Sequence, residues 1–274
     1  MTPARARAIN LFGTDVIVLG GGLYEKFPPL PGLWQTPARW HNRRFMAHIS
    51  LFIGGIRSLP ESGRPTGIYK QPVHNRLTLG QEGFAGDVQA DRRVHGGPEK
   101  AVHLYPAAHY VRLAEHFPEA AGQLVPGSMG ENLSTADLDE SSVRVGDIWR
   151  FGGARLQVCQ PRTPCWKIDE RFGSEGMAAF IGEQRLTGWY WRVLTAGEVT
   201  PGDELLLEKA ASDNPILADA MALWAQHRPD LVELARLAAS EGIAAHWRNK
   251  IEQRLTWLRH QTNVAPPAFH VKPE

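Results

Sequence analysis

The feature that most constrains this chain is a series of short apolar segments, separated by Gly, Pro and Asp, that runs from His48 to Glu208. Short segments at this spacing are typical of strands in an antiparallel barrel or sandwich. We expect strands at 48–53, 67–73, 76–79, 101–105, 148–151, 154–160, 189–194 and 204–207. The sequence therefore predicts a mainly β domain, a barrel or a sandwich, over residues 46–210.

Two stretches of this domain are near-copies of each other. Val143-Arg-Val-Gly-Asp147 and Val199-Thr-Pro-Gly-Asp203 each place a Gly-Asp pair directly before a predicted strand. Gly and Asp are turn formers for different reasons, the first by its backbone freedom and the second by its side-chain hydrogen bonds. We expect these two turns to be equivalent corners of the barrel.

Helical periodicity interrupts and then replaces the strand pattern. Apolar residues recur at helical spacing over 110–117 and 177–181, which predicts two helices inserted in the barrel domain. Three further amphipathic stripes lie in residues 213–262, with Pro229 and Gly242 between them. They predict a small C-terminal three-helix domain, followed by a tail at 263–274. We expect His103 on a strand and His109 on a helix surface.

Residues 1–45 differ in composition from the rest. They are basic and rich in proline, and Asp15-Val-Ile-Val-Leu-Gly-Gly-Gly22 has the pattern of a strand and a glycine turn. Glu25 stands where a dinucleotide fingerprint has its third glycine, and no βαβ pattern follows, which argues against a Rossmann site. We expect an N-terminal extension, with Met46 as an alternative start of the protein.

Charge and cysteine content limit the partners. The chain has 30 Lys and Arg against 29 Asp and Glu, so its formal net charge is +1, and no general attraction to nucleic acid or to an anionic membrane results. The 2 cysteines cannot form a disulfide framework, which predicts a reducing compartment. The longest apolar stretch is far shorter than the roughly 20 residues of a membrane helix. We expect a cytoplasmic protein that binds neither membranes nor nucleic acid.

The richest candidate for chemistry is Gln160-Pro-Arg-Thr-Pro-Cys165-Trp-Lys167. Cys165 follows a predicted strand on a proline-stiffened loop, and Arg162 and Lys167 give it a positive surrounding that favours thiolate. A thiolate suits a nucleophile or a ligand of a soft metal, whereas the alternative is a small buried apolar residue. Cys159 continues a strand pattern, and we expect it to be structural.

Two other runs contain candidate ligand contacts. His95-Gly96-Gly97 lies in Asp91-Arg-Arg-Val-His-Gly-Gly-Pro-Glu-Lys100, where the glycines would let backbone N–H groups approach an anion or a planar ligand. The alternative is a turn before the strand at 101–105. In Gly127-Ser-Met-Gly-Glu-Asn132-Leu-Ser-Thr135 the amide of Asn132 is the candidate, in what by itself is typical of a polar loop.

In order along the chain, these runs resemble the MOSC domain, named from the C-terminal domain of molybdenum cofactor sulfurases. The resemblance rests on Gly86-Asp87, His95-Gly-Gly-Pro98, Gly130-Glu-Asn-Leu-Ser134, Val145-Gly-Asp147 and Gln160-Pro-Arg-x-Pro-Cys165. It covers residues 46–210, and the three C-terminal helices are similar to those of the YiiM-like branch. Residues 1–45 match nothing in that branch.

The resemblance implies a barrel that holds the molybdenum cofactor, molybdopterin, with Cys165 as the catalytic thiolate ligand of the metal. It also implies an oxidoreductase that reduces N-hydroxylated purines of the 6-hydroxylaminopurine type. From motif position, the candidate contacts to the cofactor's anionic tail are Arg162, Lys167 and Lys100, and those to its pterin are His95, Gly96, Gly97 and Asn132.

Two functions from different classes follow. The first is a molybdenum-dependent reductase of N-hydroxylated bases, which needs a separate electron-donating flavoprotein or ferredoxin-type reductase because the chain has no flavin, haem or iron-sulfur signature. The second is a non-catalytic carrier of cofactor or sulfur on Cys165. A homodimer is compatible with both. DNA binding by the C-terminal helices is a further alternative, which the neutral charge of residues 213–262 disfavours.

Overall fold

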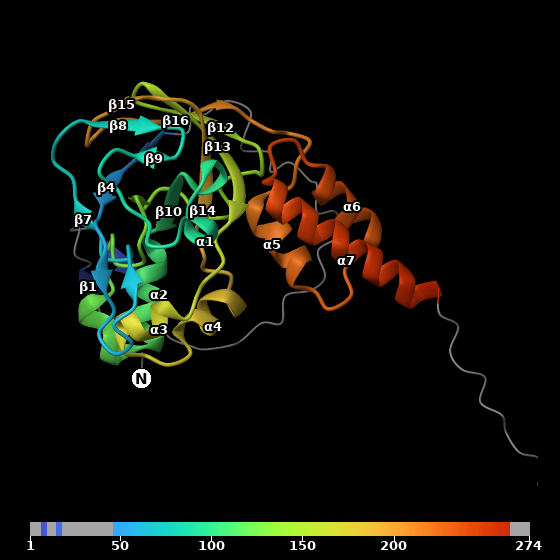
Figure 1. Ribbon diagram of the computed structural model, residues 1–274, viewed down its shortest axis with the longest axis horizontal. Coiled ribbons are helices and arrows are strands. Elements are labelled where there is room, and N and C mark those ends of the chain that lie inside the picture. Colours follow the sequence, from blue (N-terminus) through green and yellow to red (C-terminus); the bar gives the residue numbers. More distant parts are fainter. Residues whose placement is uncertain (1–6, 10–14, 18–45, 264–274) are drawn as a thin grey trace, which may run out of the picture. The chain divides into compact units, whose positions relative to one another are not determined.

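The computed structural model of the protein is shown in Figure 1, and it describes residues 7–9, 15–17 and 46–263. The chain divides into two compact units, Met1–Leu33 and Trp34–Glu274. In the first unit β1 (Arg7–Ile9) pairs antiparallel with β2 (Asp15–Ile17). β2 coincides with the first residues of the strand predicted from Asp15 onward. The predicted glycine turn and the proline-rich segment lie outside the described residues.

A nine-stranded mixed sheet forms the barrel domain (Figure 1), with the order β3-β16-β12-β13-β14-β10-β11-β4-β7. Among the described pairs of this sheet, β10 and β11 run parallel and the others are antiparallel. The strands are β3 (Met46–His48), β4 (Ser50–Ile53), β7 (Gln71–Pro72), β10 (Val102–Pro106), β11 (Leu133–Thr135), β12 (Ile148–Phe151), β13 (Ala154–Pro161), β14 (Trp189–Thr195) and β16 (Glu204–Lys209). Two smaller sheets comprise β15 (Gly197–Val199), β8 (Leu77–Gly80) and β9 (Gly83–Phe84), and β5 (Arg57–Ser58) with β6 (Pro65–Thr66).

The mainly β prediction is confirmed, with differences at particular strands. The segments predicted at 148–151, 154–160, 189–194 and 204–207 are strands. The segment 67–73 is strand only at Gln71–Pro72. Conversely, the prediction of a polar loop at 133–135 is wrong, since β11 lies within the sheet with all three residues buried.

The two predicted corners have the same local structure. Gly146 has φ of +89° and Gly202 has φ of +93°, a region that glycine adopts without strain. Asp147 Oδ2 accepts from the backbone N–H of Arg144 at 2.7 Å, and Asp203 Oδ2 accepts from that of Thr200 at 2.7 Å. The carboxylate therefore closes each turn in the same way.

The inserted helices pack on an apolar cluster that includes Leu113, Phe117, Ile168 and Met177. His109 lies on the first long helix as predicted, but its predicted surface position is wrong. The residue is 6% exposed, and its Nε2 lies 2.8 Å from Glu140 Oε2. The helices are α1 (Arg92–His95), η1 (Pro98–Lys100), α2 (Ala108–His116), η2 (Pro118–Gln123), α3 (Lys167–Phe172) and α4 (Met177–Glu183).

The C-terminal segment folds into three helices, as the apolar stripes predict: α5 (Leu217–Ala225), α6 (Leu231–Ala239) and α7 (Ala245–Asn263). Asp230 caps α6 by accepting from the backbone N–H groups of Val232 and Glu233. Leu237, Ile251 and Leu255 are among the buried residues of this domain. In the described part of the chain, no helix combines the length and the apolarity that crossing a membrane requires.

Close contacts fix the α6–α7 loop to the barrel. Asn214 Nδ2 donates to the carbonyl oxygens of Val145 and Glu241 at 2.8 and 2.9 Å. A Cβ on Gly146 would lie 2.3 Å from the Glu241 oxygen, so the loop approaches a barrel corner as closely as glycine allows. The Ala245 N–H, at the start of α7, donates to both carboxylate oxygens of Glu99 at 3.0 Å.

Candidate cofactor-binding site

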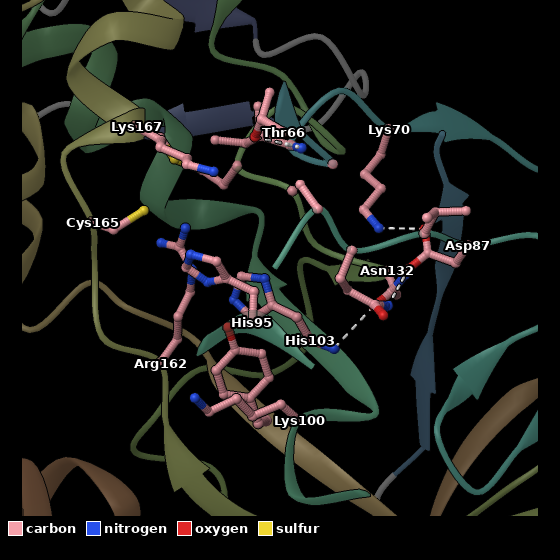
Figure 2. Close-up of a pocket in the computed structure, with 18 residues that line it drawn as sticks. Thr66, Lys70, Asp87, His95, Lys100, His103, Asn132, Arg162, Cys165 and Lys167 are labelled. Atoms are coloured by element: carbon pink, nitrogen blue, oxygen red, sulfur yellow. Dashed lines mark hydrogen bonds and ion pairs between the residues drawn. The ribbon is translucent and has the colours of Figure 1, made fainter. Parts of the chain in front are cut away.

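One cavity of about 80 Å³, named the barrel cavity here, brings together most of the predicted site residues (Figure 2). His95, Lys100, Asn132, Arg162, Cys165 and Lys167 all line it. They come from α1, η1, the segment before β11, the connection between β13 and α3, and the first residue of α3. The structure does not place Gly96 or Gly97 among the lining residues.

Arg162 is the most unusual group of this site. It follows β13, is only 7% exposed, and its backbone N–H donates to the Gly188 carbonyl at 3.1 Å. Its Nη1 is buried and has no hydrogen-bond partner. A buried guanidinium N–H without an acceptor destabilises a protein unless a ligand supplies the acceptor. This atom therefore marks a position for an anionic or carbonyl group.

Cys165 differs from Cys159 in accessibility. Cys165 is half-buried and its thiol lines the cavity, where Figure 2 shows it near Lys167. Cys159 is fully buried in β13, and its Sγ donates to the Glu99 carbonyl at 3.1 Å. Burial raises the pKa of the Cys159 thiol to about 12, which agrees with its predicted structural role.

The charged groups of the cavity are mostly cationic. Asp87 is the one carboxylate among its described lining residues, and it forms an ion pair with Lys70 whose two side chains are 1% and 4% exposed. Asp87 also accepts from Asn132 Nδ2 at 3.0 Å and from the Gly54 N–H at 2.9 Å. Among the described residues Lys100, Arg162 and Lys167 have no ion-pair partner, so their charges are available to a ligand. The ammonium groups of Lys100 and Lys167 each donate to a backbone carbonyl, that of Val94 and that of Pro65.

Asn132 is bonded within the protein on both sides of its amide. Besides Asp87, its Nδ2 donates to the Phe52 carbonyl at 3.3 Å, and its Oδ1 accepts from the His103 N–H at 3.2 Å. These bonds join β4, β10 and the loop that carries Asp87. The structure therefore gives Asn132 a role in shaping the cavity wall.

His95 is neutral in this environment. Burial, and then the nearby charges of Arg162 and Lys167, lower the pKa of His95 to about 4. The pKa of His103 is also lowered, well below its ordinary value, chiefly by burial. Two neutral imidazoles can donate or accept hydrogen bonds to a polar ligand without adding charge.

Comparison with known proteins agrees with this arrangement. The MOSC domain model matches residues 91–206. Protein YiiM of Escherichia coli (strain K12) is 37% identical over 207 residues, which cover 75% of this chain and 91% of that protein. The chain belongs to the MOSC-domain family.

Further relatives place it within that family. The crystal structure of YiiM from Escherichia coli has a TM-score of 0.66 at 30% identity and covers 78% of this chain and 94% of that one. A Gibberella moniliformis protein named "Reductase" is 35% identical over 144 residues, which are 52% of this chain and 26% of that protein. The MOSC motif residues His95, Arg162 and Cys165 meet at one cavity in this chain.

Several residues that line the cavity were not predicted to be site residues. Among them are Thr66, Lys70, Asp87, His103 and Tyr190. Asp87 belongs to Gly86-Asp87, one of the motifs on which the family resemblance rests. Its place just before the run Asp91–Lys100 is the sequence signal that could have marked it as a site residue. Lys70 gave no signal, because its partner Asp87 is 17 residues away in the sequence and only the fold joins them.

The residues present fit a molybdenum cofactor. MOSC domains are associated with that cofactor, and here one accessible thiol, unpaired cations and the orphaned Arg162 Nη1 lie in one cavity. The described residues contain no group of three or more His, Cys, Asp or Glu that could hold a metal ion. A single thiolate matches a metal that arrives with its other soft donors already attached.

Proposed function

We propose that this protein is a molybdenum-cofactor-dependent reductase of N-hydroxylated purines, of the 6-hydroxylaminopurine type, or of related N-hydroxylated compounds. The observation that carries the proposal is the buried, unpartnered Nη1 of Arg162 in the cavity that Cys165 also lines. Membership of the MOSC family supports the cofactor, and the relative named "Reductase" supports the reaction class.

In this proposal Cys165 binds the metal as a thiolate, and Arg162, Lys100 and Lys167 bind the anionic tail. A guanidinium presents two parallel N–H groups to a phosphate, whereas the lysines act as point charges. When bound, the cofactor would supply the two electrons that reduce an N–OH group; of the two protons consumed, one leaves with the hydroxyl group as water and the other completes the amine.

The protein's own residues position the reactants and limit water. Tyr190 of β14 and Arg162, which follows β13, are both buried and line the cavity. His95 stays neutral above its lowered pKa of about 4, so it accepts or donates a hydrogen bond at neutral pH without repelling the cationic groups. Electrons come from a separate reductase partner of flavoprotein or ferredoxin type.

Metal analysis with turnover tests the proposal. Protein from a host that makes the cofactor is expected to hold about one molybdenum per chain and to reduce 6-hydroxylaminopurine to adenine with a chemical electron donor. Stoichiometric molybdenum without turnover would contradict the reductase and favour a carrier of cofactor or sulfur. Absence of molybdenum would contradict both the reductase and a carrier of cofactor, and it would leave only a carrier of sulfur.

A further inference from the structure

A second cavity of about 470 Å³ lies between the barrel and the three-helix domain, and we name it the interface cavity. Five residues line both cavities: His95, Lys100, Arg162, Cys165 and Tyr190. A ligand in the interface cavity can therefore reach Cys165 without leaving the site. The wall opposite the barrel consists of Met221, Trp224, Ala225, His246, Trp247 and Lys250, from α5 and α7.

The helical wall is aromatic and held in place. Trp247 is 5% exposed and Met221 is 6% exposed, so both belong to the packed interior of the helical domain. Arg254 lies over the ring of half-buried Trp224, with 4.9 Å from its guanidinium carbon to the ring centroid, and it also donates to the Trp224 carbonyl. A fixed indole is a good stacking surface for a planar heterocycle.

The charge of the interface cavity has one sign. Its described lining residues include Lys100, Arg162, Arg185 and Lys250 and no Asp or Glu. Lys100 on η1 and Lys250 on α7 both line the cavity, and the pKa of Lys100 is lowered, first by burial and then by the charge of Lys250. A phosphate at Lys250 would reduce the repulsion between these two cations.

We infer that the interface cavity is the substrate chamber and that it selects a purine carried as a mononucleotide, with the base against Trp224 and the phosphate at Lys250. The inference rests on the proposed reductase function and narrows its substrate class. Arg162, Lys100 and Lys167 remain for the anionic tail of the cofactor, and Lys250 is available to the substrate because it lines only the interface cavity. The three-helix domain thereby becomes part of the site that chooses the substrate.

Equilibrium binding tests the inference without relying on turnover. The cofactor-loaded protein is titrated by calorimetry with adenosine monophosphate and with adenosine, neither of which contains an N–O bond to reduce. We expect the monophosphate to bind about tenfold more tightly, since a charge-assisted contact distinguishes the two ligands. Equal affinities for the two ligands would overturn the phosphate assignment.

A matched pair of variants locates the phosphate contact. Lys250→Gln is expected to remove most of the preference for the monophosphate and to leave adenosine affinity within about twofold. Lys209→Gln removes the same charge at an exposed position that lines neither cavity, and it should keep the preference. Retention of the full preference in Lys250→Gln would place the phosphate elsewhere and overturn the inference.

A second pair tests the aromatic wall. Trp224→Ala should weaken adenosine and its monophosphate alike by about tenfold. Trp257→Ala removes an indole that is 55% exposed on α7 and lines neither cavity, so it should leave both affinities unchanged. Unchanged affinities in Trp224→Ala would overturn the stacking assignment.

The cofactor state distinguishes this inference from the proposed function. Binding that occurs only in cofactor-free protein would show that the cofactor itself fills the interface cavity, and it would overturn the substrate chamber. Binding with the expected preference but no reduction of any N-hydroxylated purine would retain the chamber and contradict the reductase.

Discussion

At the scale of single residues, the two cysteines show how surroundings decide chemistry. Cys165 is half-buried and lines both cavities, whereas Cys159 is fully buried and donates to the Glu99 carbonyl. Their sequence separation is only six positions, and both are free thiols. Only the first can meet a ligand that enters a cavity.

Serine substitutions should therefore differ in effect. Cys165→Ser is expected to lose molybdenum retention and turnover, because a hydroxyl is a harder and weaker donor to this metal than thiolate. Cys159→Ser keeps a small donor for the same carbonyl and should leave turnover within about threefold. Metal analysis and steady-state rates of both variants check this. Full molybdenum occupancy and turnover in Cys165→Ser would rule out the metal-ligand role.

Arg162 is expected to lower the stability of the cofactor-free protein and to strengthen the binding of the cofactor. In the cofactor-free protein its buried Nη1 has no partner, so Arg162→Met is expected to raise the free energy of unfolding by about 1–3 kcal/mol while it reduces cofactor retention. Denaturant titration of the cofactor-free forms and molybdenum analysis after expression measure the two effects. Arg150→Met, at an exposed position of β12, is the control and should change neither. A destabilised Arg162→Met would show that the guanidinium is stabilising without a ligand.

Residue patterns predicted several of the residues that line the cavity but not which of them are bonded to each other. His95, Lys100, Arg162, Cys165 and Lys167 could be proposed because each lies in a dense local run of glycine, proline and charge. The bonds that occupy Asn132 join it to residues up to 80 positions away, so no local pattern could reveal them. Hydrogen bonds between residues that are distant in the sequence can be known only from the folded structure.

At the scale of elements, turns and central strands were predictable and buried polar strands were not. β12 consists mainly of β-branched and aromatic residues and ends before Gly152-Gly153, and β13 begins after that pair and ends at Pro161, so their bounds could be predicted closely. β11 consists of Leu-Ser-Thr, and its Ser134 hydroxyl donates to the Tyr105 carbonyl at 2.9 Å. Tertiary hydrogen bonding, rather than propensity, makes this segment a strand.

The two equivalent corners provide a controlled test of domain attachment. Gly146→Ala and Gly202→Ala share the strain of a positive φ, about 1 kcal/mol each. Only at Gly146 would the new Cβ meet another segment, 2.3 Å from the Glu241 oxygen, whereas nothing lies within 4 Å at Gly202. We expect Gly146→Ala to be destabilised by about 1–3 kcal/mol more, as an overpacked contact. Thermal denaturation measures both, and equal losses would contradict the close contact between the loop and the corner.

At the scale of the whole molecule, stability should carry a pH signature from Asp147. Burial raises the pKa of this carboxyl from 3.8 to about 6. Between these values the folded protein holds a proton that the unfolded chain has released, so this contribution to stability is present at low pH and is lost as pH rises through the window.

Asp147→Asn removes that titration. The free energy of unfolding of the wild type, relative to the variant, should fall by about 3 kcal/mol as pH rises from 3.8 to about 6. Urea denaturation of both proteins at a series of pH values measures the difference. A difference that stays constant with pH would show that Asp147 ionises normally in the folded state.

Glu99 makes site occupancy and domain docking parts of one equilibrium. Its carboxylate accepts hydrogen bonds from the backbone N–H of Ala245, the first residue of α7, and from the Arg192 guanidinium. Its backbone carbonyl accepts from Cys159 Sγ and Gln160 Nε2. The next residue, Lys100, lines both cavities. A ligand that contacts both the barrel wall and the helical wall stabilises the state in which the helices are docked on the barrel. By thermodynamic linkage, undocking of the helices weakens the binding of that ligand. Amide hydrogens of α7 should consequently exchange more slowly with solvent when the site is filled, so the helical domain reports occupancy at a distance from Cys165.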